Sequence, residues 1–469
     1  MSLTASLTVR IAKARPSILA LALALILGAA AQDAASSKTA PAPAAPENGV
    51  LKNLTFSGDI QIQDDSISGG PANGSLDRNR LRYRVRLNLT TQLDHDFSGG
   101  VSVASGDVND PTSTNQTATG FYTRKPLELN KAYLQFQPHA FPALTVTGGK
   151  FAYPWHSTQL VWDSDLNPEG LAETLAFPLR EVGPLKQLAV VGFELPFAEV
   201  AGVALEDKSI AQSAVYGGQT QTAWQLARRL SLQADTGFYN YHNADPIALA
   251  LAKASVKNPQ TPGVGTLPLA SGSASENSIV TTTAANQVTI GGAAYPTGVT
   301  TVTSAQFASK FGLFDTLARL DVNTGSPKWP LALIGDFVQN TEACANAGAI
   351  ARAPANTAAV HYSQTTNLPC DPRQRRGTWF EARVGRGQQA GDWEFRYVHT
   401  IIEHEAVLSN FDYNNLRQGA DVIEHIATAA YQWHRNVQLS FTGLIGRPLD
   451  PAPNETWLRR FDTAVTYSF

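Results

Sequence analysis

The chain has 469 residues and a formal net charge of −3, from 36 Lys and Arg against 39 Asp and Glu. This mildly acidic balance disfavours a nucleic-acid partner, which needs a basic surface. Beyond the N-terminal segment, no apolar stretch approaches the ~18 residues that a transmembrane helix needs. The remainder is rich in Thr, Gln, Asn, Gly and aromatic residues, a composition that favours strands with one polar face. The mature chain is therefore either an exported soluble protein or a membrane barrel.

The N-terminus has the pattern of an export signal. Its basic residues are Arg10, Lys13 and Arg15. An almost unbroken apolar run follows from Ser17 to Leu27, and three alanines at 29–31 supply the small residues of a signal-peptidase site. This run is too short to span a bilayer, so we expect residues 1–31 to be removed as a signal peptide. Three cations and no acids would leave with it, which changes the formal charge from −3 to −6.

Two regions follow the expected signal. Residues 32–50 are rich in Ala, Pro and Ser, which predicts a short periplasmic linker. Over residues 51–469 the dominant hydrophobic period is two, which is the period of a β-strand. The sequence therefore predicts an all-β fold for 51–469, namely a transmembrane antiparallel β-barrel.

The clearest strand lies between Arg78 and Leu89. Arginines occupy alternate positions on one of its faces: Arg78, Arg80, Arg82, Arg84 and Arg86. The positions between them are apolar: Leu81, Tyr83, Val85, Leu87 and Leu89. A helix would scatter both sets around its axis, whereas a strand places them on opposite faces.

About fifteen segments share this period, and one more strand near Ala172–Arg180 or within 243–310 would make the number even. Single-chain bacterial barrels use an even number of strands of roughly 9–11 residues. We therefore expect about sixteen strands, within a range of fourteen to eighteen, with short periplasmic turns and long extracellular loops. Besides Arg78–Leu89, the candidates are Leu54–Ile62, Phe97–Ser105, Leu127–Gln137, Leu144–Phe151, Pro184–Leu195, Ser213–Leu226, Leu230–Tyr241, Thr316–Val322, Leu331–Gln339, Gly377–Arg386, Asp392–Thr400, Val422–Trp433, Asn436–Gly446 and Trp457–Phe469.

Two long tracts have the composition of loops. Asn243–Gln306 is rich in small and polar residues and is expected to be a surface loop, either merely mobile or carrying a hairpin that extends beyond the membrane. Thr341–Arg375 contains the two cysteines of the chain, Cys344 and Cys370. In an oxidising compartment these cysteines can pair, and the resulting disulfide would staple the loop.

The end of the chain is a further amphipathic strand with an aromatic last residue. Such an ending resembles the signal that barrel-insertion machinery reads in outer-membrane proteins. We expect four residues on one face of this strand to carry the signal: Phe461, Val465, Tyr467 and Phe469.

The arginine face is expected to point away from lipid. An arginine exposed to lipid at mid-membrane costs ~2–4 kcal/mol. Three of them would oppose insertion by an amount comparable with the whole stability of a domain, ~5–15 kcal/mol. We therefore expect Arg80, Arg82, Arg84 and Arg86 to line the lumen as a basic ladder. A closely packed interior could not hydrate or pair so many charges, so the lumen is expected to hold water.

An acidic segment is a candidate to face this ladder. Residues 155–173 show no strand period and contain four carboxylates: Asp163, Asp165, Glu169 and Glu173. We interpret these as constriction acids that fold into the channel, where opposed charges would set selectivity. An external loop with solvated acids is the alternative. A loosely bound calcium ion is a further interpretation, although Pro168 stands where an EF-hand loop needs glycine; no other cofactor is indicated.

Four motifs together resemble one family. The segments RNRLRYRVRLNL, LNKAYLQFQP, LTVTGGKFAYPW and WDSDLNPEG are similar to the putative porin family of bacterial outer membranes, over most of the mature chain. The resemblance implies a porin for passive diffusion of small hydrophilic solutes. It also implies contact with the lipid bilayer, lipopolysaccharide and the barrel-insertion machinery, and it is compatible with a homotrimer.

The sequence does not indicate an enzyme. The G-x-S-x-G, P-loop and H-E-x-x-H patterns are not found. His399, Glu403, His404 and Glu405 lie near a strand end and are interpreted as rim residues. The alternatives to a porin are a barrel-embedded hydrolase, whose Ser/His/Asp site need not be local in sequence, and a surface receptor or adhesin.

Overall fold

The computed structural model describes residues 53–70, 77–118, 121–179, 183–198, 213–255, 277–290, 293–346, 370–451 and 453–469. The expected signal peptide and linker at 1–50 lie outside these residues. Within the described ranges, no helix is both long and apolar enough to cross a membrane.

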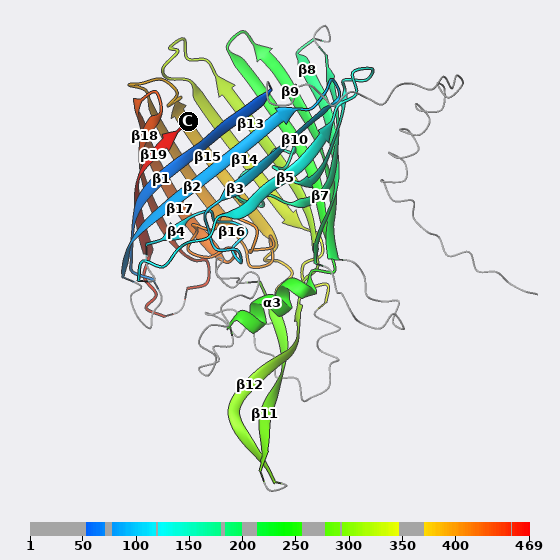
Figure 1. Ribbon diagram of the computed structural model, residues 1–469, viewed down its shortest axis with the longest axis vertical. Helices are drawn as coiled ribbons and strands as arrows, with labels where there is room; N and C mark the ends of the chain where they lie inside the picture. Colours follow the sequence, from blue (N-terminus) through cyan, green and yellow to red (C-terminus); the bar gives the residue numbers. More distant parts are fainter. Residues whose placement is uncertain are drawn as a thin grey trace, which may run out of the picture. The chain divides into compact units, whose positions relative to one another are not determined.

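The described residues form a barrel of sixteen long strands (Figure 1). These strands are β1 (Leu54–Ser68), β2 (Arg78–Gln92), β3 (Phe97–Ala104), β5 (Glu128–Phe136), β6 (Leu144–Lys150), β7 (Glu169–Pro178), β8 (Leu185–Ala198), β9 (Ser213–Ala227), β10 (Leu230–His242), β13 (Phe311–Val322), β14 (Leu331–Asn340), β15 (Arg376–Gly385), β16 (Trp393–Ile402), β17 (Val422–His434), β18 (Val437–Pro448) and β19 (Leu458–Ser468).

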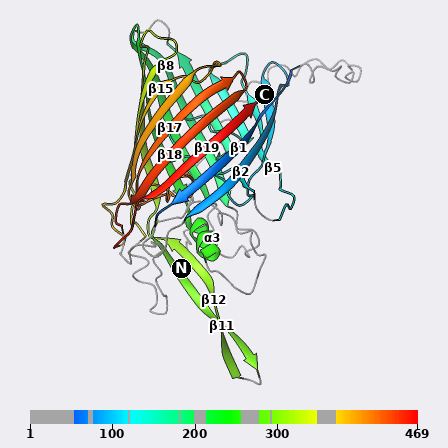
Figure 2. The same ribbon diagram turned by 90° about the vertical axis from the view of Figure 1, so that its left-hand side faces the viewer.

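The barrel is closed, because every strand pairs antiparallel with the next strand along the wall and the last pairs with the first. In the closing pair β1–β19, Ile60 lies opposite Tyr467. Figure 2 shows β19 between β18 and β1, with β2 on the far side of β1. A two-residue strand, β4 (Gln116–Thr117), pairs with β2 beyond the end of β3. Closure leaves no unpaired strand edge, which is what a lipid environment requires of a sheet.

The two ends of the barrel differ in their connections. At one end, seven connections have two to eight residues each, for example 228–229 between β9 and β10. At the other end, the connections have at least nine residues, and the longest runs from 243 to 310 between β10 and β13. Outer-membrane barrels place short turns in the periplasm and long loops outside the cell.

The outer face is apolar and carries an aromatic belt near the short turns. Along β19, Phe461 and Val465 are exposed on this face, whereas Arg460 and Ala464 on the opposite face are buried. Ring contacts near the short turns join Phe56 to Phe469, Phe97 to Phe136, Trp329 to Phe395, and Trp393 to both Phe395 and Tyr431. Aromatic girdles at this level are typical of the membrane–water boundary of such barrels.

Part of the interior is filled by loops. Residues 151–168, between β6 and β7, place Trp155 and Trp162 in a buried cluster with the inward side chains Phe193 and Tyr239. Residues 403–421, between β16 and β17, contribute further buried side chains to the same cluster. The inward faces of β8 and β10 are therefore apolar where these loops cover them.

The predicted number of strands is confirmed. The sixteenth strand is β7, close to the expected Ala172–Arg180. The tract 243–306 contains the helix α3 (Asp245–Ser255) and the strands β11 (Ile279–Ile290) and β12 (Ala293–Phe307). β11 and β12 pair with each other and form a separate two-stranded sheet, so the hairpin alternative describes this tract.

Candidate channel constriction

The arginine ladder lies on the inward face of β2 and is matched by carboxylates of β1. Antiparallel pairing sets Asp59 opposite Arg86 and Asp65 opposite Arg80. Asp59 Oδ2 accepts a hydrogen bond from Arg86 Nε at 2.7 Å, and Asp59 Oδ1 lies 2.9 Å from Arg84 Nη2. Arginines of β2 are thus paired with aspartates of the neighbouring strand β1, and do not depend on charges from the other side of the lumen.

A denser group lies nearer the long loops, around Asp65. Its carboxylate lies 2.5 Å from Arg80 Nε and 3.0 Å from Arg460 Nε. Arg82 Nη1 is 3.9 Å away, and Arg82 Nη2 donates to Ser113 Oγ at 3.2 Å. The Asp65 side chain has no exposed surface. This group is a buried ion network and holds β1, β2 and β19 together.

Loop 151–168 brings one of the predicted constriction acids to the ladder. Asp165 Oδ1 lies 3.3 Å from Arg86 Nη1, and Asp165 Oδ2 accepts hydrogen bonds from the backbone N–H and hydroxyl of Thr114. The Arg86 side chain is 32% exposed, more than those of Arg80, Arg82 and Arg84. Arg86 is therefore the member of the ladder most open to solvent, and Asp165 is its partner from the loop.

The other part of the same loop is attached to the strands β9, β10 and β14. His156 Nδ1 lies 3.0 Å from Asp235 Oδ2 on β10, and the backbone N–H of Thr158 donates to Asp336 Oδ2 on β14. The side-chain amide of Gln219 on β9 donates to the carbonyl of His156. Because its anchors lie on β2, β9, β10 and β14, the loop crosses the interior of the barrel.

Asp163 is buried and does not face the ladder. Its carboxylate accepts hydrogen bonds from the backbone N–H groups of Asp165 and Asn414. The backbone N–H of Asp163 donates to the carbonyl of Phe411. Asp163 therefore joins loop 151–168 to loop 403–421, and the expectation that it opposes the arginines across the channel is wrong.

Glu169 and Glu173 also differ from the expectation, because residues 169–178 form a strand. In β7 these glutamates share a face with Leu175 and Phe177, which are exposed on the outer wall, whereas Ala172 on the opposite face is buried. Glu169 lies 3.2 Å from Lys150 of β6. These two residues are therefore outside the lumen and cannot be constriction acids.

The carboxylates of 163–169 have separate partners and do not converge. Among the described residues, no group of three or more His, Cys, Asp or Glu side chains is placed to hold a metal ion. The aromatic cluster packs against β8 and β10, so loops fill part of the lumen on that side. Charged side chains line another part of the interior, along β1 and β2.

The remaining predicted residues lie outside the constriction. Phe461, Val465, Tyr467 and Phe469 are exposed on the outer face, and the Phe469 ring contacts Phe56. Their role as an insertion signal stays a prediction.

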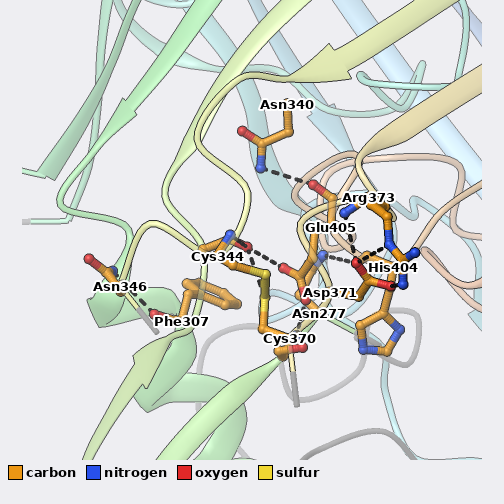
Figure 3. Close-up of a disulfide and its surroundings, with 12 residues drawn as sticks. Asn277, Phe307, Asn340, Cys344, Asn346, Cys370, Asp371, Arg373, His404 and Glu405 are labelled. Carbon is orange, nitrogen blue, oxygen red and sulfur yellow. Dashed lines mark hydrogen bonds and ion pairs between the residues drawn. A yellow bond between two sulfur atoms is a disulfide. The ribbon is translucent and has the colours of Figure 1, made fainter. Parts of the chain in front are cut away.

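Cys344 and Cys370, both in the connection between β14 and β15, form the expected disulfide (Figure 3). Ser309 lies next to it, accepting a hydrogen bond from the backbone N–H of Cys344 and donating one to Glu405 Oε2 at 2.6 Å. Burial raises the pKa of Glu405 to about 7. His399 stacks on His425, on the outward face of β16, and is thus separate from Glu405.

Sequence reasoning missed Asp59 and Asp65. Both lie at alternate positions in the strand before the ladder, with Ile60 and Ile62 on the opposite face. The alternation of polar and apolar residues in this segment could therefore have predicted that both aspartates point into the barrel. Their pairing with particular arginines depends on the β1–β2 register, which the period alone does not define.

Comparisons with known proteins place this geometry in context. Residues 50–453 match the model of a family described as putative porin. Similar solved structures include OprB of Pseudomonas putida, with 12% identity, a TM-score of 0.47 and coverage of 89% of this chain and 95% of that one. OmpF of Salmonella typhi has 9% identity, a TM-score of 0.46 and coverage of 89% and 98%. The outer-membrane channel DcaP of Acinetobacter baumannii has 11% identity and a TM-score of 0.41, with coverage of 89% of this chain and 97% of that one. A comparison with curated proteins finds no match.

Proposed function

The chain belongs to the putative porin family and is an outer-membrane porin, and on this premise we propose that small hydrophilic solutes diffuse passively through its lumen, past a constriction formed by Arg86 and Asp165. The observation that carries the proposal is the contact of loop 151–168 with the ladder, in which Asp165 meets the most exposed arginine. A loop that narrows a barrel at opposed charges selects solutes by size and charge.

The wall around this path has the chemistry of a channel in lipid. Apolar side chains on the outer face contact the bilayer, and inward Arg, Asp, Ser, Thr and Gln side chains face the lumen. The protein acts as a non-enzymatic channel in this proposal. Lipopolysaccharide and the barrel-insertion machinery are its proposed partners at the outer face, and a homotrimer is the proposed assembly.

Reversal potentials in planar bilayers test the role of the two charges. One unit charge at about 5 Å contributes roughly 0.8 kcal/mol even in water, which corresponds to about a fourfold change in the ratio of anion to cation permeability. Arg86→Ala should therefore shift selectivity toward cations, and Asp165→Asn should shift it toward anions. Asp64→Asn is the matched control, because Asp64 is an exposed residue on the outer face of β1.

Both substitutions break the same ion pair but remove charges of opposite sign. The direction of each shift therefore separates an electrostatic effect on selectivity from an effect on the position of the loop. If the pair acted only by holding the loop in place, both variants would change selectivity in the same direction. Shifts in the same direction, or shifts no larger than that of Asp64→Asn, would contradict a constriction at this position.

A further inference from the structure

A cationic hollow lies at the short-turn end of the barrel interior. It has a volume of about 510 Å³ and is lined by the turns β9–β10, β13–β14 and β15–β16 together with the adjoining strands. Its lining includes one acid, Asp321. The basic residues of the lining are Arg228, Arg229, Arg319, Arg383 and Arg386.

Three of the five arginines are neutralised by neighbouring carboxylates. Arg319 forms three hydrogen bonds of 2.8–3.1 Å with Asp321. Arg383 Nη2 lies 2.6 Å from Glu381 Oε1. Arg386 Nε lies 2.9 Å from Asp392 Oδ2. Glu381 also pairs with Arg396 at 3.0 Å, so these pairs leave a small positive charge of their own.

Arg228 and Arg229 differ from the other three. They form the exposed two-residue turn between β9 and β10, and neither forms an ion pair with any residue in the part of the chain that the structure describes. Two guanidinium charges at the hollow are therefore uncompensated.

The neighbouring turn positions Arg229 at the hollow. The backbone N–H of Asn323 donates to the carbonyl of Arg229 at 2.9 Å. Gly325 has φ +89°, and a Cβ there would lie 3.3 Å from Arg229 Nη1. A side chain at position 325 would thus crowd the guanidinium, and glycine leaves room for it.

We propose that this hollow is a binding site for small multivalent oxyanions, which carry two or more carboxylate or phosphate groups. A guanidinium presents a planar set of donors that matches either group with paired hydrogen bonds. The volume corresponds to on the order of 17 water molecules at ~30 Å³ each, which is enough for such an anion with part of its hydration shell. The site lies at the periplasmic mouth, and this inference rests on the proposed channel function.

Sided block of single channels by inorganic pyrophosphate tests the proposal. Pyrophosphate is added first to one side of a planar bilayer and then to the other. In the unmodified protein, the pyrophosphate concentration that halves the current is lower for addition to one side of the bilayer than for addition to the other. The double variant Arg228→Ala/Arg229→Ala raises that concentration about tenfold, the effect of losing two exposed ion pairs, and leaves block from the other side unchanged.

Two further variants control for charge and for folding. Arg435→Ala removes an exposed arginine from another short turn, the one between β17 and β18, and leaves the block unchanged. Arg228→Lys/Arg229→Lys keeps the charge and retains most of the sided block. Heat-modifiable gel mobility verifies that each variant is folded.

The outcomes separate this site from the channel itself. If the channels conduct but pyrophosphate blocks them equally from both sides, the proposal is overturned and the porin function stands. The same holds if Arg435→Ala loses as much block as Arg228→Ala/Arg229→Ala does. Folded protein that carries no current overturns the porin function as well.

Discussion

The substitution Asp65→Asn tests how the barrel tolerates its buried charges. Asp65 is the common partner of Arg80 and Arg460, at 2.5 and 3.0 Å, and its side chain has no exposed surface. The substitution keeps the size of the side chain and removes its charge. It leaves two guanidinium groups beside a neutral amide, with a third, that of Arg82, close by.

The expected loss of stability follows from the burial of the partners. Removing one partner of a buried ion pair costs ~3–5 kcal/mol, because the remaining charge stays desolvated. The side chains of Arg80 and Arg460 are 17% and 6% exposed, so water reaches them only in part. We therefore expect Asp65→Asn to lower the free energy of unfolding by about 3 kcal/mol.

Equilibrium unfolding in urea, with the protein in lipid vesicles, measures this loss. Asp64→Asn is the control, because the neighbouring residue is exposed on the outer face, and it should change stability by less than ~0.5 kcal/mol. The double variant Asp65→Asn/Arg80→Gln should recover part of the loss, since it removes one uncompensated charge, whereas Arg460 keeps Asp462 as a partner at 3.2 Å. Equal stability of Asp65→Asn and Asp64→Asn would refute the reasoning.

Three further predictions concern the loops and the chain end. Burial raises the pKa of Glu405 to about 7, above its ordinary value of about 4.5. The contribution of Glu405 to folding stability is therefore fully present at low pH and is lost as the pH rises from about 4.5 to about 7. The protection factor of the Ser278 amide, which donates to Glu405, is its exchange rate corrected for intrinsic base-catalysed exchange; it should fall over this range and stay constant with pH in Glu405→Gln. Cys344→Ser/Cys370→Ser should accelerate exchange of the residue-344 amide, which donates to Ser309, and leave heat-modifiable mobility unchanged; altered mobility would show that the barrel depends on the disulfide. Phe469→Ala removes a ring contact with Phe56 worth ~0.5–1.5 kcal/mol and should slow assembly by purified insertion machinery, while an unchanged rate would remove Phe469 from the insertion signal.

The strands were predictable from sequence wherever the two faces differ in polarity. β2 is the clearest case, because arginine and apolar residues alternate over its length. β7 was not resolved in the same way. Its inward residues Gly170, Ala172 and Ala176 are small, and its outward residues include Glu169 and Glu173, so no contrast between polar and apolar faces exists.

The interior was less predictable, because it depends on contacts between segments distant in sequence. β8 is apolar on both faces, with Val190 exposed outside and Val191 and Phe193 buried inside. Such a pattern does not say which face meets lipid and which meets a loop. Likewise, Asp165 was a candidate from its position in an acidic segment, whereas its contact with Arg86 depends on the path of loop 151–168 through the barrel.

The central claim is that the inward polar side chains enclose a continuous path of water through the membrane. Single-channel conductance of the refolded protein in planar bilayers, measured in a series of KCl concentrations, tests this claim most directly. We expect discrete, ohmic steps whose size rises in proportion to the conductivity of the solution. Protein that is folded by its heat-modifiable mobility, is inserted in the bilayer and still carries no current would contradict the account.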